Sequence, residues 1–392
     1  MNSTIDFAIA SANIFSMDLD KVEFSDFGAD RMTLKIEMST SAGFDDPNKT
    51  DIIENLYYAD YQGKVTLYGL GKIWNDHILA WCTKGGDEKP LDTIYRSIYA
   101  RFTYSYQGEE DVETASVIRS IYYSSRYVNK TPEEMQNFIP LVGRKKRTFF
   151  DFSEPFFLID GTGFGRRNIS VGLAYKDEGL AKYHEMAIEE DDHGGSFMYF
   201  DFSPERLLNF LNFDLKKEIN LNSLLFFDVL LYDGDQLLDK CRYTIEHRNF
   251  SQHSEFCYMN MLGAFESVGF TGLLTNTPER EAEYGYCGDD YAALDLQVND
   301  VIEINTGWCN KEMMAQVRDM IESPLILKRE NGEWKKVVIT AIDYSISRPT
   351  NSSFNAKITY RYADEVDALD ADLIPWMDKK VFERPQFDRS FA

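Results

Sequence analysis

The sequence predicts a mainly β protein with two or three β-sandwich-like domains, a few short helices and an extended C-terminal arm. The chain contains 28 Phe and 23 Tyr among 392 residues, and both residue types favour strands. Many short runs also alternate apolar and polar residues between turn signals, which is typical of half-buried strands. The length is sufficient for several domains, and the 44% hydrophobic content is sufficient for packed cores.

The first domain is expected at residues 1–148. Met32–Met38 reads MTLKIEM and has the alternation of a strand. After Val65 and Leu67, a helix is predicted because the apolar stripe changes to a helical spacing at Leu70, Ile73, Trp74 and His77. Thr131–Glu134 combines a cap, a first-turn proline and a capping-box glutamate, which predicts a short helix.

The second domain is expected at residues 149–250. Apolar runs predict strands within 149–159, 169–175, 196–202 and 224–248. Ser203–Pro204 predicts the start of a helix that carries Leu207, Leu208 and Leu211, and Asp233–Gly234 predicts a turn between two strands. Short strands separated by turns indicate a sandwich. The preceding basic run Arg144–Arg147 is expected to be a solvated turn, with a local phosphate or partner contact as the alternative.

The third domain is expected at residues 251–363. It opens on Phe256–Gly272, whose two aromatic runs are hinged near Gly263. Asn310 is a predicted cap for a helix that ends before Ser323–Pro324, and Asn331–Gly332 is a strong hairpin turn signal. The last strand of the sheet is expected within 354–364.

Residues 364–392 form the predicted extended arm, which is acidic and interrupted by prolines. We expect this arm to pack either on its own core or on a neighbouring subunit. Its aromatic residues are the candidate inter-subunit contacts: Trp376, Phe382, Phe387 and Phe391.

The charge and the cysteines restrict the classes of function. The net charge of −24 repels phosphate backbones and anionic lipid, which disfavours nucleic-acid and membrane-surface binding. The odd number of cysteines and the lack of a CxxC pair indicate reduced thiols, as in a protein assembled in a cytoplasm: Cys82, Cys241, Cys257, Cys287 and Cys309. Met1–Ala10 lacks the pattern of a signal peptide, and no apolar run reaches membrane-spanning length.

Motifs for nucleotide and zinc chemistry are incomplete. Gly161–Gly165 superficially resembles a phosphate loop, but a strand-like run follows it where a helix is required, so a hairpin turn is expected. His184–Ile188 begins like a zincin helix, yet Ile188 occupies the position of the second histidine. His193 follows an acidic run that lacks the alternation of a calcium loop, so a solvated loop is expected.

Two further groupings are considered around the third domain. His247, His253 and Glu255 lie close in sequence and are a minor candidate for a metal site, with a solvated inter-strand loop as the favoured interpretation. Cys257 with either histidine would mimic a thiol dyad, but a strand position between Phe256 and Tyr258 favours buried packing. We therefore predict no catalytic residue, no cofactor and no metal, and hence no enzyme.

The stretch from Phe256 to Gly272 nevertheless carries a resemblance. Its pattern places an aromatic residue, Asn, Gly, an acid, Phe and Gly at fixed spacings: Phe256, Asn260, Gly263, Glu266, Phe270 and Gly272. This pattern resembles a segment of tail proteins encoded by Bacteroidetes-infecting phages and prophages. Three further stretches are similar to those proteins in the same order: residues 57–78, 117–147 and 321–340. Together the stretches span most of the chain up to Asp364.

The resemblance implies a virion structural protein of the tail hub, tail tip or baseplate. It further implies a ring made of copies of this chain in contact with other phage tail proteins, built in the host cytoplasm and located in the virion tail. DNA would pass through such a ring without specific binding, and no membrane contact is implied. The residues leave two alternatives: a glycan- or receptor-binding β-sandwich module, since tyrosines permit sugar stacking, and a cell-envelope glycosidase, which needs only two placed carboxylates.

Overall fold

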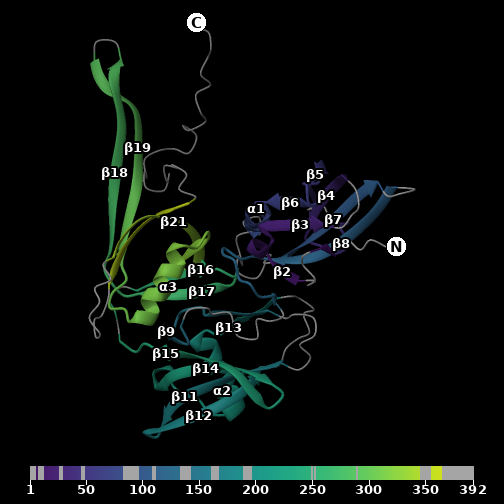
Figure 1. Ribbon diagram of the computed structural model, residues 1–392. Coiled ribbons are helices and arrows are strands. Elements are labelled where there is room, and N and C mark those ends of the chain that lie inside the picture. The colour runs from purple at the N-terminus through teal and green to yellow at the C-terminus, as the bar shows by residue number, and fades with distance from the viewer. Residues whose placement is uncertain are drawn as a thin grey trace.

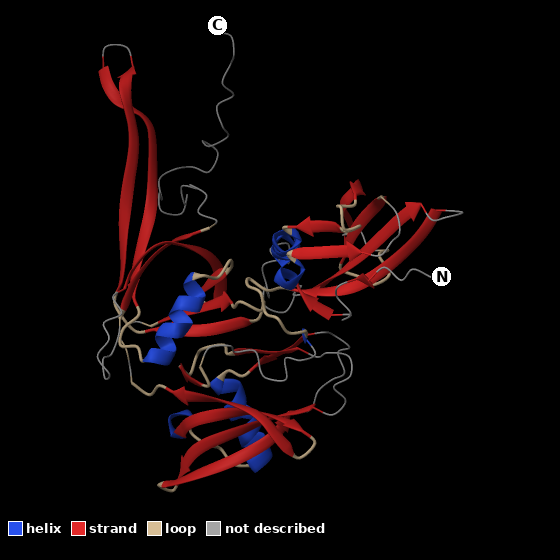
Figure 2. Ribbon diagram, in the orientation of Figure 1, coloured by secondary structure: helices blue, strands red, loops and turns tan. Residues whose placement is uncertain are grey.

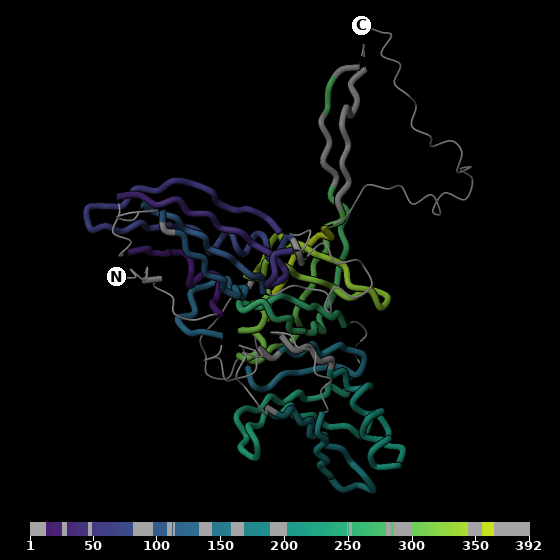
Figure 3. The backbone as a smooth tube through the Cα atoms, turned by 90° about the vertical axis from the view of Figure 1, so that its right-hand side faces the viewer, coloured from purple at the N-terminus to yellow at the C-terminus, as the bar shows by residue number. Residues whose placement is uncertain are grey.

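A computed structural model gives the structure of the protein. It describes residues 6–7, 13–25, 30–45, 49–82, 97–107, 112–132, 143–159, 167–188, 197–248, 250, 253–287, 290–344 and 355–363. The predicted fold class is confirmed, because strands in several sheets dominate and helices are few and short (Figure 2). We describe three units, at residues 6–132, 143–248 and 253–363. The third unit lies between the other two in both Figure 1 and Figure 3.

The first unit contains two sheets that share one hydrophobic core. The order is β2-β8-β7-β4-β5 in the larger sheet and β1-β3-β6 in the smaller one. The strands are β1 (Asp6–Phe7), β2 (Asn13–Phe15), β3 (Lys21–Ser25), β4 (Arg31–Ser39), β5 (Thr50–Tyr58), β6 (Val65–Tyr68), β7 (Ser97–Gln107) and β8 (Val112–Tyr122). A 3-10 helix at Ser16–Leu19 follows β2. β7 alternates strictly between buried and partly buried residues, so a single face of the strand faces the core.

The helix predicted after β6 is confirmed as α1 (Leu70–Cys82). Trp74 is fully buried in the core of the first unit and packs edge-on against Phe102 of β7, with ring centroids 6.1 Å apart. Asn75 donates to the Ser124 carbonyl at 2.8 Å, which ties the helix to the end of β8. The helix predicted from Thr131–Glu134 falls mostly outside the described residues, which stop at 132 in this segment.

The second unit has a five-stranded sheet, of order β12-β11-β14-β15-β9, and one covering helix. Its strands are β9 (Lys145–Thr148), β11 (Arg167–Asp177), β12 (Leu180–Ile188), β14 (Leu224–Asp233) and β15 (Gln236–Ile245), with a small separate sheet of β10 (Pro155–Ile159) and β13 (Phe197–Asp201). The helix α2 (Pro204–Leu215) starts at the predicted proline. It buries its predicted leucines, Leu207, Leu208 and Leu211, against the sheet.

The basic run before this unit is not the solvated turn that the sequence predicts. Residues 145–148 form β9, which pairs in parallel with β15 from Arg242↔Lys145 to Ile245↔Thr148. Lys146 is buried, and its ammonium group contacts the carboxylate of Glu266 in the third unit. The ion partner, 120 residues away in sequence, makes burial of this lysine possible.

The third unit is a seven-stranded sheet of order β17-β16-β20-β21-β22-β19-β18. Its strands are β16 (Ser254–Met259), β17 (Phe265–Phe270), β18 (Leu274–Cys287), β19 (Asp290–Asn305), β20 (Ile326–Glu330), β21 (Glu333–Tyr344) and β22 (Ala356–Tyr362). The predicted helix is α3 (Lys311–Ile321), and the Asn310 side chain accepts from the Met313 N–H at 2.7 Å as the expected cap. Asn331 and Gly332 have positive φ and form the predicted turn between β20 and β21.

β18 and β19 form a two-stranded ribbon that extends away from the rest of the molecule (Figure 1). The two strands pair continuously from Leu274↔Ile304 to Cys287↔Asp290, with one bulge at Glu283/Tyr284. β22 pairs with β19 only from Ile302 to Asn305. Within the described parts of the chain, the ribbon beyond Ile302 is therefore two strands wide, and both of its outer edges lack a partner strand.

Candidate functional site

The hairpin of β16 and β17 is where the three units meet, and we call residues 256–272 the junction. The two strands pair from Ser254↔Phe270 to Met259↔Phe265, and every residue of β17 is buried. Buried residues on both faces of a strand require a packed layer on each side. The junction is therefore an internal element that contacts neighbours on both faces.

One face of the junction completes the core of the first unit. Cys257, Met259 and Phe265 are fully buried in the same cluster as Trp74 and Phe102. The other face packs on α3, because Phe256 and Phe270 share a cluster with Val317 and Met320. The rings of Phe256 and Phe270 lie 5.2 Å apart. Each buried aromatic or aliphatic side chain contributes about 1.5–3 kcal/mol, so this packing is a major part of what joins the units.

A buried polar cluster lies at the turn of the junction. The Asn260 side-chain oxygen accepts from the N–H groups of Leu262 and Ala264, at 3.0 and 3.1 Å, and so fixes the turn. Its amide nitrogen donates to Glu266 at 2.8 Å, and Glu266 also accepts from Lys146 of β9. Burial lowers the pKa of Lys146, but the nearby Glu266 carboxylate, together with Cys241 and Glu154, raises it, so its pKa lies above the ordinary value. The lysine is therefore charged, and the cluster is a buried ion pair that links the second and third units.

Two positions of the junction require glycine, because neighbouring segments lie too close to leave room for a side chain. Gly263 has φ +79°, and an added Cβ would lie 3.0 Å from the Tyr123 Cβ of the first unit. An added Cβ at Gly272 would lie 2.3 Å from the carbonyl oxygen of Asn305. The Met261 carbonyl also accepts from the Ser125 N–H at 2.9 Å. The first unit thus packs directly on the turn, where a side chain would separate the two backbones.

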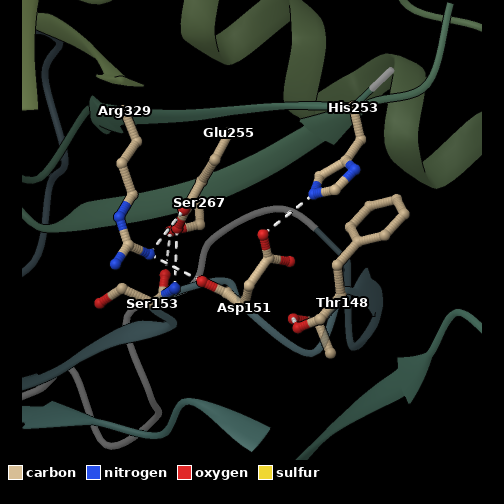
Figure 4. Close-up of polar contacts among 8 residues, drawn as sticks. Thr148, Asp151, Ser153, His253, Glu255, Ser267 and Arg329 are labelled. Atoms are coloured by element: carbon tan, nitrogen blue, oxygen red, sulfur yellow. Dashed lines mark hydrogen bonds and ion pairs between the residues drawn. The ribbon is translucent and has the colours of Figure 1, made fainter. Parts of the chain in front are cut away.

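A second polar cluster joins residues 151–153 to the third unit (Figure 4). Glu255 accepts from the Ser153 N–H at 2.8 Å and from Arg329 of β20 at 3.0 Å. Arg329 also donates to the Asp151 carbonyl at 2.7 Å, and Ser267 donates to the Ser153 carbonyl at 2.7 Å. These bonds hold the segment between β9 and β10 against β16, β17 and β20.

Two carboxyl groups near the junction have perturbed acidity. Burial raises the pKa of Glu255 to about 7, and the bonds from Arg329 and the Ser153 N–H lower it by less. Burial and the charges of Glu266 and Glu322 raise the pKa of Asp319, on α3, to about 7. Perturbed carboxyl groups occur at catalytic sites, but structural ion-pair networks produce them too. The contacts of Glu255 are those of a structural network.

The residues considered for a metal site are held in separate contacts. Glu255 is committed to Ser153 and Arg329, whereas His253 lies 3.0 Å from Asp151 and stacks on Phe149 at 5.4 Å. His247 packs edge-on against Phe150. Among the described residues, no group of three His, Cys, Asp or Glu side chains is arranged to hold a metal ion.

The other candidates are placed as follows. Cys257 is fully buried in the strand β16, as its neighbours predict. His184 lies in β12, not in a helix, and contacts Asp214 of α2 at 2.5 Å. Several candidates lie outside the described residues: Gly161–Gly165, His193, Trp376, Phe382, Phe387 and Phe391.

Sequence reasoning missed the ribbon and the partners of the junction. A signal for the ribbon exists, since Glu279, Glu281 and Glu283 recur at every second position within β18. The partners Lys146, Ser153 and Arg329 carry no local signal, because their roles arise only when distant segments meet.

Comparison with known proteins gives no family assignment. No protein-family model and no curated protein matches the chain. One solved structure that it partly resembles is the full extracellular region of plexin A4, with 10% identity and a TM-score of 0.17, over 90% of this chain and 38% of that one. The chain spans well under half of that structure. Among the described residues, no helix is long and apolar enough to cross a membrane.

Proposed function

We propose that this chain is a structural protein of a phage tail, which assembles with copies of itself into a ring in the tail hub, tail tip or baseplate. The resemblance to such tail proteins is strongest at the motif within 256–272. The observation that supports the proposal is the position of the motif residues in the structure. Its six residues are the packing and hydrogen-bonding groups of the junction, so the shared pattern falls on the residues that set the architecture.

The architecture suits a subunit whose three units keep a fixed arrangement within an assembly. A buried ion pair, a buried aromatic core and two glycine-mediated contacts join the three units at one point. Units joined in this way keep a fixed arrangement, since moving one would expose buried apolar and charged groups to water. A fixed arrangement is what a ring requires, because the ring closes only when each copy repeats the same contact.

The test is the location of the protein in phage particles. Particles released by the bacterium that carries the gene would be purified by density gradient, and the protein would be quantified by mass spectrometry relative to the major capsid protein. Gold-labelled antibody against the purified chain should mark the tail, at a low and fixed copy number per particle. Absence of the protein from intact particles would contradict the proposal.

The C-terminal arm is a separate part of this proposal. Residues 364–392 lie outside the described residues, and their aromatic side chains remain candidate contacts between subunits. A chain that ends at residue 363 should keep the thermal unfolding of the full chain and lose assembly. Loss of monomer folding would show instead that the arm packs on its own core.

The glycan- or receptor-binding alternative has one observation in its favour. Tyr58 and Tyr61, at the end of β5 and in the turn that follows, are 70% and 94% exposed. Exposed rings on an ordered turn are able to stack on sugars, and Asp60 orders this turn by accepting from the Gln62 and Lys64 N–H groups. Binding to bacterial surface polysaccharide that is lost in Y58A/Y61A would favour this alternative. The glycosidase alternative gains no support from the described residues.

A further inference from the structure

We infer that a single proton on Asp319 controls how firmly the helix α3 is docked on the junction. The neutral carboxyl group of Asp319 allows the helix to stay docked, and the charged form weakens the contact. This control acts within one chain and goes beyond the proposed function, because it holds whether or not the protein belongs to a phage tail.

The helix α3 connects the first unit with the junction. Its buried residues Val317 and Met320 pack in one cluster with the aromatic residues of the junction (Figure 1). At its C-terminal end, the carboxylate of Glu322 contacts the guanidinium group of Arg126, which follows β8 of the first unit. Side-chain contacts of this kind hold a docked helix in place, so a change in one of them changes the docking.

Asp319 lies in the last turn of α3, where the helix meets the junction. One oxygen of its carboxyl group is buried, and within the described parts of the chain this oxygen has no hydrogen-bond partner. The same interface contains two buried donors, the Tyr258 hydroxyl and the side-chain amide of Gln316, which lies one turn earlier on the helix. Neither group donates to Asp319. A buried carboxylate requires donors, so this arrangement fits a neutral carboxyl group.

The charges around Asp319 also favour its neutral form. The charged and titratable groups that face it from the surrounding elements are Glu266 of β17, Lys146 of β9, Tyr258 of β16, Arg126 after β8, and Arg318 and Glu322 of α3 itself. Each of the three cations is in an ion pair with one of the two glutamates. Burial and the charges of these glutamates raise the pKa of Asp319 to about 7, and Lys146 and Arg126 lower it by less.

The dependence on pH follows from the difference between the docked and the undocked helix. An undocked α3 exposes Asp319 to water, where its pKa returns to the ordinary value of 3.8, whereas the docked helix holds the proton up to about pH 7. Between these two values docking takes up one proton, so the equilibrium constant for docking falls about tenfold for each pH unit. The helix is therefore held most firmly below about pH 4 and least firmly above about pH 7.

Undocking of α3 uncovers the aromatic face of the junction. Val317 and Met320 cover Phe256 and Phe270, which are buried in the same cluster. The first unit then also loses its ion pair with the C-terminal end of α3. The proton on Asp319 thus determines how often an apolar surface between the units opens to water near neutral pH.

The test compares the wild type with D319N, whose side chain has the same shape and stays neutral at every pH. Amide hydrogen exchange of the full chain would be followed by mass spectrometry from pH 5 to pH 8. Protection factors would correct for the pH dependence of the intrinsic exchange rate. E312Q is the matched control, because Glu312 is an exposed carboxylate in the first turn of the same helix. Circular dichroism would check the folding of each variant.

In the wild type and E312Q, we expect the protection factors of residues 313–321 to fall about fiftyfold between pH 5 and pH 8. Most of this fall should be absent in D319N. At pH 8 the helix should also be less protected than the strands β11 and β14, because it opens without unfolding of the chain.

Three results would overturn the inference. The first is a wild-type helix whose protection does not change between pH 5 and pH 8, which requires no variant to fold. The second is the same pH dependence in D319N as in the wild type. The third is equal protection of α3, β11 and β14 at every pH, since the helix would then leave the junction only when the whole chain unfolds.

Discussion

Substitution of Lys146 by Met is the most direct test of the junction. The side chains of Lys146 and Glu266 are 4% and 1% exposed, so neither charge is solvated by bulk water. Loss of one partner of a buried ion pair costs about 3–5 kcal/mol, because the remaining charge stays buried and uncompensated. We expect K146M to lower the free energy of unfolding by this amount, measured by urea denaturation followed by Trp fluorescence and circular dichroism.

Two variants make the argument specific. In K146M/E266Q the charge is removed from both sides and the Gln oxygen still accepts from Asn260, so we expect most of the loss to be recovered. K357M removes a lysine that is 48% exposed and lies 2.6 Å from Glu303, which is itself 33% exposed. An exposed pair contributes about 0–1 kcal/mol, so K357M should have a small effect. A loss below about 1 kcal/mol in K146M, or losses in the double variant that simply add, would refute the buried-pair account.

Three further substitutions test other parts of the structure. G263A should lower the free energy of unfolding in urea by about 2 kcal/mol or more, because an alanine at φ +79° is strained and its Cβ would meet Tyr123. G332A, at φ +89° with no atom near the added Cβ, measures the backbone strain alone. Equal losses of stability in the two variants would exclude a contribution from Tyr123. E255Q should become more stable relative to the wild type as pH rises from 4.5 to 7. The folded state holds the Glu255 proton up to about pH 7, whereas the unfolded state holds it only up to about pH 4.5. The protonated Glu255 therefore stabilises the wild type at low pH, and the wild type loses about 3 kcal/mol of this stability between pH 4.5 and 7. An unchanged difference between pH 4.5 and 8 would contradict this. N310A should cost about 1 kcal/mol in thermal unfolding through loss of the α3 cap, and no loss would mean that the cap bond is replaced.

The elements that the sequence predicted well are those encoded by neighbouring residues. Asn310 caps α3 through a group three residues away, and the Asn331–Gly332 turn is set by backbone preferences within the dipeptide. The apolar stripe of Leu207, Leu208 and Leu211 is likewise local, because it follows from the spacing of three to four residues that places side chains on one face of a helix. Signals of this kind are complete within about one helical turn or one hairpin, so they can be read without knowing the fold.

The elements that the sequence did not reveal depend on distant partners. Lys146 looked like part of a solvated basic run, because its buried partner Glu266 belongs to another unit. The sequence groups Glu255 with the neighbouring histidines, whereas its hydrogen-bond partners in the structure are Ser153 and Arg329. In both cases the residue type is polar and the local pattern indicates solvent, and only the tertiary contact determines burial.

The parallel pairing of β9 with β15 has a consequence during synthesis. β9 leaves the ribosome well before β15, and about 100 residues at roughly 5–20 residues per second correspond to a delay of about 5–20 s. For that time β9 has neither its strand partner nor the carboxylate that Lys146 contacts. Clustered positive charge keeps an unpaired strand soluble and discourages its aggregation. The basic run of an otherwise acidic chain therefore protects the nascent polypeptide first, and serves the finished molecule only afterwards.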